Sequence, residues 1–137
     1  ADAHYRLGRI ARRAGRYAEA IDCFNRVVGI DENHAQHEIW REVGATYLEA
    51  GQLEDAVGAF ERYVSTRSTD AEGLFLLGIA LSRLRRYDEA REQMLTVVEI
   101  VNSAPAFKFR QEQRWLHEAE AYLKQNESQM RRGTEAT

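Results

Sequence analysis

The chain has 137 residues, of which 44% are hydrophobic and 30% are charged, with a formal net charge of −3. These values are typical of a globular domain and argue against a disordered chain. They also exclude a strongly basic surface of the kind that follows a phosphate backbone, so we expect no nucleic-acid partner. Because the apolar runs are short, we expect no membrane insertion.

Hydrophobic periodicity predicts an all-α chain of helices separated by short turns. The single proline agrees with this, since proline interrupts helices. In chain order, helices are expected at residues 2–14, 17–30, 38–50, 53–66, 71–84 and 87–101. After Pro105, which suits a first helical turn, one more helix is expected from 106 to about 125.

Three glycines stand at the same position in alternate helices. Gly8, Gly44 and Gly78 each follow an aliphatic residue and are 36 and 34 residues apart. A glycine inside a helix costs about 1 kcal/mol relative to alanine, so its recurrence indicates that two backbones approach closely there. We expect the small alanine of the following helix, such as Ala20, to meet the glycine, with aromatic residues on either side.

A period near 34 residues made of two helices resembles the tetratricopeptide repeat. The segments that carry the resemblance read His4-Leu7-Gly8-Gly15-Tyr17-Ala20-Phe24, Trp40-Val43-Gly44-Gly51-Leu53-Ala56-Phe60 and Leu74-Leu77-Gly78-Arg85-Tyr87-Ala90-Met94. The chain departs from the family pattern where Arg85 replaces the turn glycine. It departs again where Glu32, Ser68 and Asn102 replace the proline that usually ends a repeat.

The resemblance implies an all-α fold, an α-solenoid that forms a right-handed superhelix of antiparallel helix pairs. Repeats are expected at 1–34, 37–70 and 71–104, followed by a capping helix at 105–126, because terminal repeats need a polar outer surface. Together these make one tetratricopeptide repeat domain, residues 1–126. Residues 127–137 are expected to form a flexible tail.

Tetratricopeptide proteins generally bind peptides or partner helices on a concave side lined by the first helix of each repeat. The resemblance therefore implies a protein-interaction scaffold. The groove residues expected on this chain are Tyr5, Arg9, Arg12, Arg13, Arg41, Ala45, Leu48, Phe75, Ile79 and Arg83, with Asp2, Glu38 and Glu72 near the rim. Because arginine forks bind carboxylates, we expect a protein or peptide partner that is acidic or amphipathic. A solvated helix face is the alternative.

Other functions of the repeat stay open at this point. The chain can instead be a self-association module within a larger multi-repeat protein, forming a homo-oligomer, or its groove can be filled by its own cap helix or tail. The carboxylate clamp that some members use for chaperone tails is not expected. Its Lys and Asn positions hold Tyr5, Arg9, Glu42, Glu72 and Leu76.

The sequence contains no nucleophile motif, phosphate loop or paired-acid arrangement, so we expect no enzyme and no cofactor. The loop at 32–38 has metal-ligand residue types, but its His34-x-x-His37 spacing is not the helix-borne metalloprotease pattern, and we expect no metal. Cys23 is expected to be an inert packing residue. As the only cysteine it excludes an internal disulfide, which favours the cytoplasm without excluding an oxidising compartment.

Overall fold

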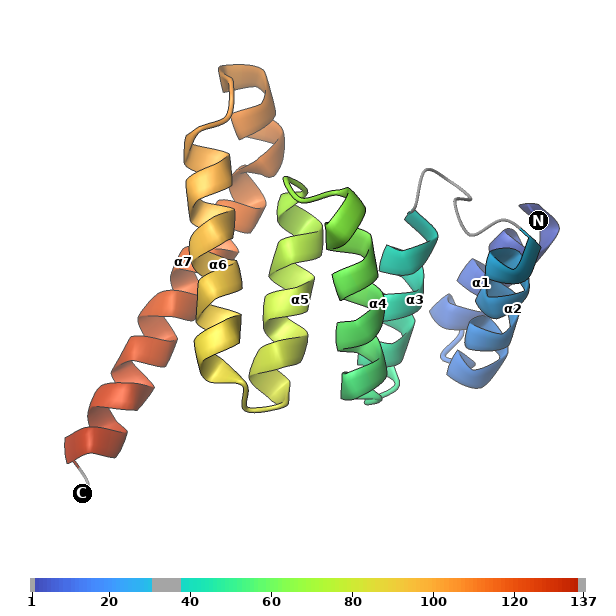
Figure 1. The fold of residues 1–137 in the computed structure, drawn as a ribbon, viewed down its shortest axis with the longest axis horizontal. Helices are drawn as coiled ribbons and strands as arrows, with labels where there is room; N and C mark the ends of the chain where they lie inside the picture. Colours follow the sequence, from blue (N-terminus) through green and yellow to red (C-terminus); the bar gives the residue numbers. More distant parts are fainter. Residues whose placement is uncertain (1, 31–37, 136–137) are drawn as a thin grey trace. The chain divides into compact units, whose positions relative to one another are not determined.

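The computed structural model describes residues 2–30 and 38–135, with side chains described for 3–29 and 38–126. Within these ranges the chain is all-α, as predicted (Figure 1). The helices are α1 (Asp2–Arg13), α2 (Tyr17–Ile30), α3 (Glu38–Glu49), α4 (Leu53–Thr66), α5 (Ala71–Arg83), α6 (Tyr87–Asn102) and α7 (Ala106–Glu135). The first six begin where the sequence predicted and end within one residue of it.

The helices belong to two compact units, residues 1–68 and 69–137, which are described separately. In the first unit α1 packs on α2, α2 on α3 and α3 on α4, so two helix pairs are joined through the second helix of the first pair. In the second unit α5 packs on α6 and α7 packs on both. The predicted arrangement of sequential helix pairs is therefore confirmed, whereas the superhelical path through both units stays a prediction.

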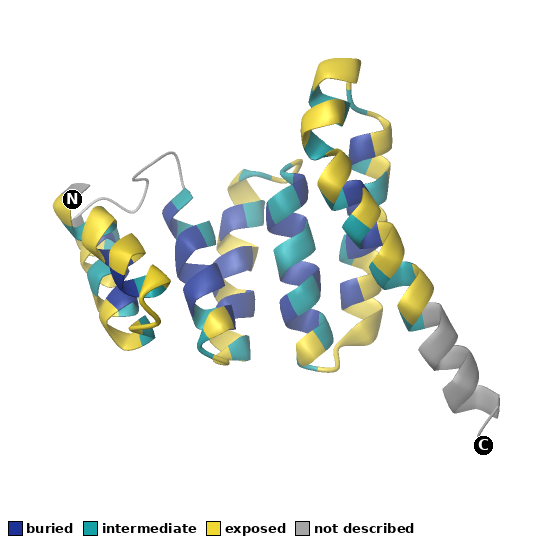
Figure 2. Ribbon diagram, turned by 180° about the vertical axis from the view of Figure 1, so that it is seen from behind, coloured by how far each residue is buried: buried dark blue, intermediate teal, exposed yellow. Residues whose placement is uncertain are grey.

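The core of the first unit is built by the apolar stripes that the periodicity identified. Its buried members come from all four helices, and the buried side of each helix is visible in Figure 2. They are Ala11, Ala20, Phe24, Val27, Ile39, Val43 and Ala59. Trp40 and Tyr47 pack against this cluster while staying half-buried. Apolar side chains of α1 and α2 thus share one core with those of α3 and α4.

The three mid-helix glycines lie in close packing, and the nearest atom in each case belongs to a large side chain of the second helix; at Gly78 the Ala90 carbonyl oxygen, 3.5 Å away, is also close. A Cβ added to Gly44 would lie 2.6 Å from the ring of Phe60, and one added to Gly8 would lie 2.7 Å from the ring of Phe24. At Gly78 the nearest atom is the terminal methyl of Met94, at 2.8 Å. Each glycine therefore makes room for the large side chain of the second helix, which lies flat against the first helix.

The turn between the paired helices needs a left-handed residue in each repeat. Gly15 and Gly51 take φ values of 78° and 81°, and Arg85 takes the same conformation with φ of 64°. Backbone hydrogen bonds close the turn in the same way in all three cases; for example, the Arg86 N–H donates to the Leu81 carbonyl at 2.9 Å. The third turn thus keeps the geometry of the other two with an arginine, where the strain is higher than for glycine.

Helix α7 covers the last helix pair. It begins after Pro105, whose carbonyl accepts a hydrogen bond from the Phe109 N–H at 2.8 Å, and it buries Leu116 and Ala119. The helix continues past 126, where we expected a flexible tail to begin, and ends at Glu135. The mobility of that stretch stays a prediction. Despite the length of α7, none of the helices in the described ranges is both long and apolar enough for a membrane crossing.

We predict that Gly44→Ala destabilises the first unit by about 1–3 kcal/mol, because the added methyl would overlap the Phe60 ring. Gly58→Ala is the matched control: Gly58 lies inside α4, and nothing lies within 4 Å of an added Cβ. Alanine should therefore stabilise by about 0.5–1 kcal/mol there, following helix propensity. Urea unfolding of both variants measures the difference. If both substitutions stabilise, close packing does not explain the glycine.

Candidate partner-binding site

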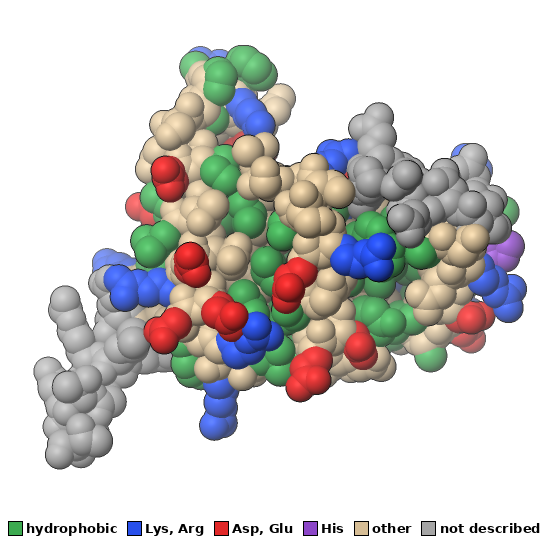
Figure 3. All heavy atoms as spheres, in the orientation of Figure 1, with side chains coloured by type: hydrophobic (Ala, Val, Ile, Leu, Met, Phe, Trp, Pro, Cys, Tyr) green, Lys and Arg blue, Asp and Glu red, His purple; other side chains and the backbone are tan. Residues whose placement is uncertain are grey.

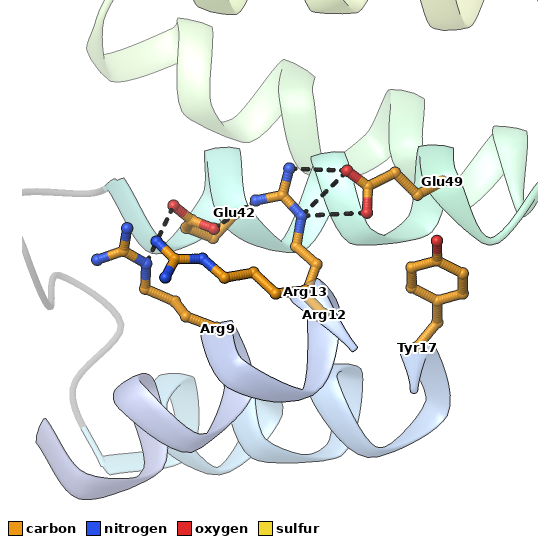
Figure 4. A pocket seen from close by; sticks show the side chains of 6 residues that line it. All are labelled: Arg9, Arg12, Arg13, Tyr17, Glu42 and Glu49. Carbon is orange, nitrogen blue, oxygen red and sulfur yellow. Dashed lines mark hydrogen bonds and ion pairs between the residues drawn. The ribbon is translucent and has the colours of Figure 1, made fainter. Parts of the chain in front are cut away.

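The first unit has an open hollow of about 410 Å³ between α1, the start of α2 and α3 (Figure 4). It is lined by Arg9, Arg12, Arg13, Tyr17, Glu42 and Glu49. Three of the arginines that the sequence predicted for a groove are therefore brought together. The two glutamates, from the facing helix α3, were not part of that prediction.

Arg12 is already bound by the protein's own carboxylates. Its Nη2 donates to Glu49 Oε1 at 2.9 Å, its Nε lies 3.3 Å from both Glu49 oxygens, and its Nη1 donates to Glu42 Oε2 at 2.7 Å. Burial alone would lower the pKa of Arg12, but the hydrogen bond to Glu49 and the charges of both glutamates more than offset it, so its pKa is raised. Arg12 thus fastens α1 to α3.

Arg9 and Arg13 face the same hollow, and the protein's own carboxylates neutralise their charges less than that of Arg12. Both are exposed; the Arg9 Nε lies 4.0 Å from Glu42, and its guanidinium lies 5.9 Å from the centre of the Tyr5 ring. Tyr5 is half-buried against Phe24, with ring centres 6.0 Å apart. Burial, followed by the charge of Glu42, raises the pKa of the Tyr5 hydroxyl.

The predicted groove residues on α3 are more covered than those on α1. Arg41 is half-buried, with its guanidinium 5.8 Å from the centre of the Tyr63 ring. Ala45 and Leu48 are each only 8% exposed. At the expected rim, Glu38 is half-buried, and the side chain of Asp2 lies outside the described residues. Among the predicted groove residues of the first unit whose side chains are described, the exposed ones therefore lie on α1.

In the second unit, the three predicted groove residues all lie on α5, and α7 runs beside them. Phe75 is half-buried and packs on Trp115 of α7, with ring centres 5.4 Å apart. Ile79 is also half-buried, and Arg83 at the end of the helix is exposed. Trp115 of α7 thus covers Phe75, one of the apolar residues expected in the groove. Covering of the groove by the chain's own cap helix is one of the alternatives left open by the sequence.

Beside Arg83 the second unit has a hollow of its own, of about 250 Å³. It is lined by Ser82, Arg83, Tyr87, Tyr122, Gln125 and Asn126. The Tyr122 hydroxyl oxygen is buried and has no hydrogen-bond partner in the described part of the chain. None of these residues except Arg83 was singled out by the sequence as a contact, because the pairing of α7 with α5 is not encoded in the repeat pattern.

The other end of α5 is acidic. Burial, followed by the negative charge of Asp70, raises the pKa of Glu112 on α7; Lys108 opposes this shift and the rim residue Glu72 adds to it. The second unit therefore has carboxylates at the start of α5 and a cation at its end. On the face drawn in Figure 3, acidic and basic side chains are interspersed, and no broad basic surface is visible there.

We predict that Glu112→Gln raises the melting temperature at neutral pH. The pKa of this carboxyl is higher in the folded state than its ordinary value of 4.5, so the group stabilises the fold fully only when the pH is below 4.5. This stabilisation is lost as the pH rises through the raised pKa of the folded state. The variant should therefore gain stability above this window and lose the pH dependence inside it. Glu120→Gln, on the exposed side of α7, is the control and should change little. If Glu112→Gln melts at the same temperature as the wild type at pH 7, the assignment is wrong.

The remaining candidates from the sequence carry no site in the structure. The loop with His34 and His37 lies outside the described residues. Among the residues that are described, no three potential metal ligands of the His, Cys, Asp or Glu type come together. Cys23 is a free, half-buried thiol on α2.

The families found by comparison with known proteins agree with the repeat pattern of the sequence. Two family models, both described as tetratricopeptide repeat, match residues 1–69 and 44–105. No curated protein sequence matches the chain.

Several solved structures share the fold at low sequence identity. PcrH of Pseudomonas aeruginosa, in complex with the chaperone-binding region of PopD, is 18% identical with a TM-score of 0.80, over 94% of this chain and 92% of that one. The type III secretion translocator chaperone SycD of Yersinia enterocolitica is 19% identical with a TM-score of 0.72, over 88% and 87%. The Sgt2 domain of Aspergillus fumigatus is 19% identical with a TM-score of 0.70, over 93% and 81%.

Proposed function

Because the chain belongs to the tetratricopeptide repeat family, we propose that it is a non-catalytic protein-interaction scaffold that binds a peptide or helix of a partner protein. The contacts would come from the first helices of the repeats, chiefly Tyr5, Arg9 and Arg13 on α1 and Arg83 on α5. The complex of PcrH with a segment of PopD supports this use of the fold, although at 18% identity it does not specify the partner of this chain.

The observation that carries the proposal is the arrangement around Arg12. Its hydrogen bonds to Glu42 and Glu49 fasten α1 to α3, so the helix backbone that carries Arg9 and Arg13 is held in place before a partner arrives. A preorganised surface loses less side-chain freedom on binding, and this increases affinity. Arg9 and Arg13 would then bind carboxylates of an acidic or amphipathic segment.

We predict that Arg9→Glu combined with Arg13→Glu lowers the affinity for acidic peptides at least about tenfold, because charge-assisted hydrogen bonds become repulsive contacts. The measurement is capture on an array of immobilised peptides that alternate acidic and apolar residues, beside a set with each acid replaced by its amide. The matched control reverses Arg16 and Arg26, which pair with the nearby Glu19 and Asp22, and it changes the net charge equally. Equal capture by both double variants would refute the assignment.

A second function, self-association, is favoured by the outer face of α1. Leu7 and Ile10, which we call the α1 stripe, are each 55% exposed. The residues at the same repeat positions in α3, Val43 and Thr46, are 2% and 0% exposed. The α1 stripe therefore has the character of a helix-binding face that no helix in the described part of the chain covers.

We propose that a second copy of the chain covers the α1 stripe with its helix α6. The stripe is flanked by Arg6 and Arg13, which are seven residues apart, or two helical turns. On the exposed side of α6, Glu92 and Glu99 have the same spacing, and Leu95 between them is 49% exposed. In a parallel pairing both arginines would meet a glutamate while the apolar side chains touch.

We predict that Arg6→Glu weakens this self-association several-fold, the effect of a surface ion pair turned repulsive, and that adding Glu92→Arg to the same chain restores it. Sedimentation velocity over a concentration series measures the association. A wild-type chain that stays monomeric at high concentration would exclude this second function and leave the scaffold proposal unaffected.

A further inference from the structure

The hollow in the second unit is enclosed by the last turn of α5, the first turn of α6 and the far part of α7. Its six lining residues are neutral except for the cation Arg83, and they include two phenols, two amides and a hydroxyl. Every one of them has a hydrogen-bond donor. Among the described residues, no carboxylate lines this hollow, and no ion pair is formed by Arg83.

The Tyr122 hydroxyl is a donor that has no acceptor in the described part of the chain. The oxygen is buried and unpartnered in the described part of the chain. Leaving a buried polar group without a hydrogen bond typically costs about 1–3 kcal/mol. An acceptor that enters the hollow and displaces the atoms covering this oxygen would remove this cost, and a charged acceptor would also interact with Arg83.

The first unit shows what chemistry fits such a hollow. Arg13 and Tyr17 line the hollow of the first unit, and Arg83 and Tyr87, seventy residues later, line that of the second. In the first unit, carboxylates from Glu42 and Glu49 occupy the space beside the guanidinium groups. In the second unit the equivalent wall comes from α7, which supplies amides in place of acids.

We infer that the hollow of the second unit binds a carboxylate of the partner segment. Arg83 supplies the charge, and the Tyr122 hydroxyl donates a hydrogen bond to a carboxylate oxygen. This inference rests on the proposed scaffold function and names one contact of it. A glutamate or aspartate side chain and the carboxyl end of a peptide share this chemistry, and the test separates them.

The test compares small probes by NMR titration of the whole chain labelled with nitrogen-15. Acetyl-glutamate amide represents an acidic side chain, acetyl-alanine a free carboxyl end, and acetyl-glutamine amide a neutral mimic. We expect at least one of the two carboxylate probes to shift resonances of Arg83 and Tyr122, and the probe that binds more tightly identifies the source. Equal binding of the neutral mimic, or no binding of either carboxylate, overturns the inference.

Two substitutions locate the contact. Tyr122→Phe should lower the affinity for the carboxylate probe about tenfold, the effect of one hydrogen bond to a charged group. It should leave the melting temperature of the free protein unchanged or raised, since the hydroxyl it removes has no partner. Arg83→Gln should weaken binding similarly. Tyr17→Phe and Arg16→Gln are the controls in the first unit and should leave the probe's affinity unchanged.

The outcomes also separate this inference from the proposed function. If acidic peptides are captured equally well by wild type and Tyr122→Phe, the scaffold stands and the hollow has no part in it. If the wild type captures no peptide, the proposed function fails, and the probe titration alone decides whether the hollow binds carboxylates. A Tyr122→Phe variant that loses stability with no loss of affinity would show that the hydroxyl is structural.

Discussion

The fold depends on the contact between a bare helix backbone and a large side chain of the next helix. Phe24 and Phe60 lie against Gly8 and Gly44 so closely that a single added carbon would overlap their rings. Both rings are fully buried, so each contact removes a whole aromatic side chain from water while bringing two helices together. The same contact sets the spacing within a pair, and thus which side chains of the first helix stay on the surface.

A second layer of organisation comes from charge. Arg12 lies where a partner-binding arginine was expected, yet it binds Glu42 and Glu49 of the neighbouring helix. A buried carboxylate such as Glu42 is costly unless it is paired and hydrogen-bonded, and Arg12 provides both. Arg12 therefore stabilises the helix that carries Arg9 and Arg13. Arginines of one helix thus differ: Arg12 makes structural contacts, whereas Arg9 and Arg13 are exposed.

Much of the fold could be predicted because repeat spacing and helix periodicity are local signals. They placed the bounds of the first six helices within one residue and identified Arg85 as the residue at the position of the turn glycine, although not its left-handed conformation. The candidate site was less accessible. The pairing of Arg12 with Glu49 joins residues 37 apart, and the packing of Phe75 on Trp115 depends on how α7 lies, so neither follows from the pattern within one helix. The side chain nearest to each glycine was also not predicted, since periodicity identifies a shared face but not which side chain on it is nearest.

The second unit has an uneven charge along α5, and this has a consequence for recognition. Asp70 and Glu72 stand with Glu112 at its beginning, whereas Arg83 stands at its end, about 18 Å away along a helix of 13 residues. A ligand chain with opposite charges at its two ends would bind along this helix in one direction, since the reversed ligand would bring like charges together at both ends. A charge difference between the two ends of a helix selects one orientation of a bound peptide without requiring any particular side-chain shape.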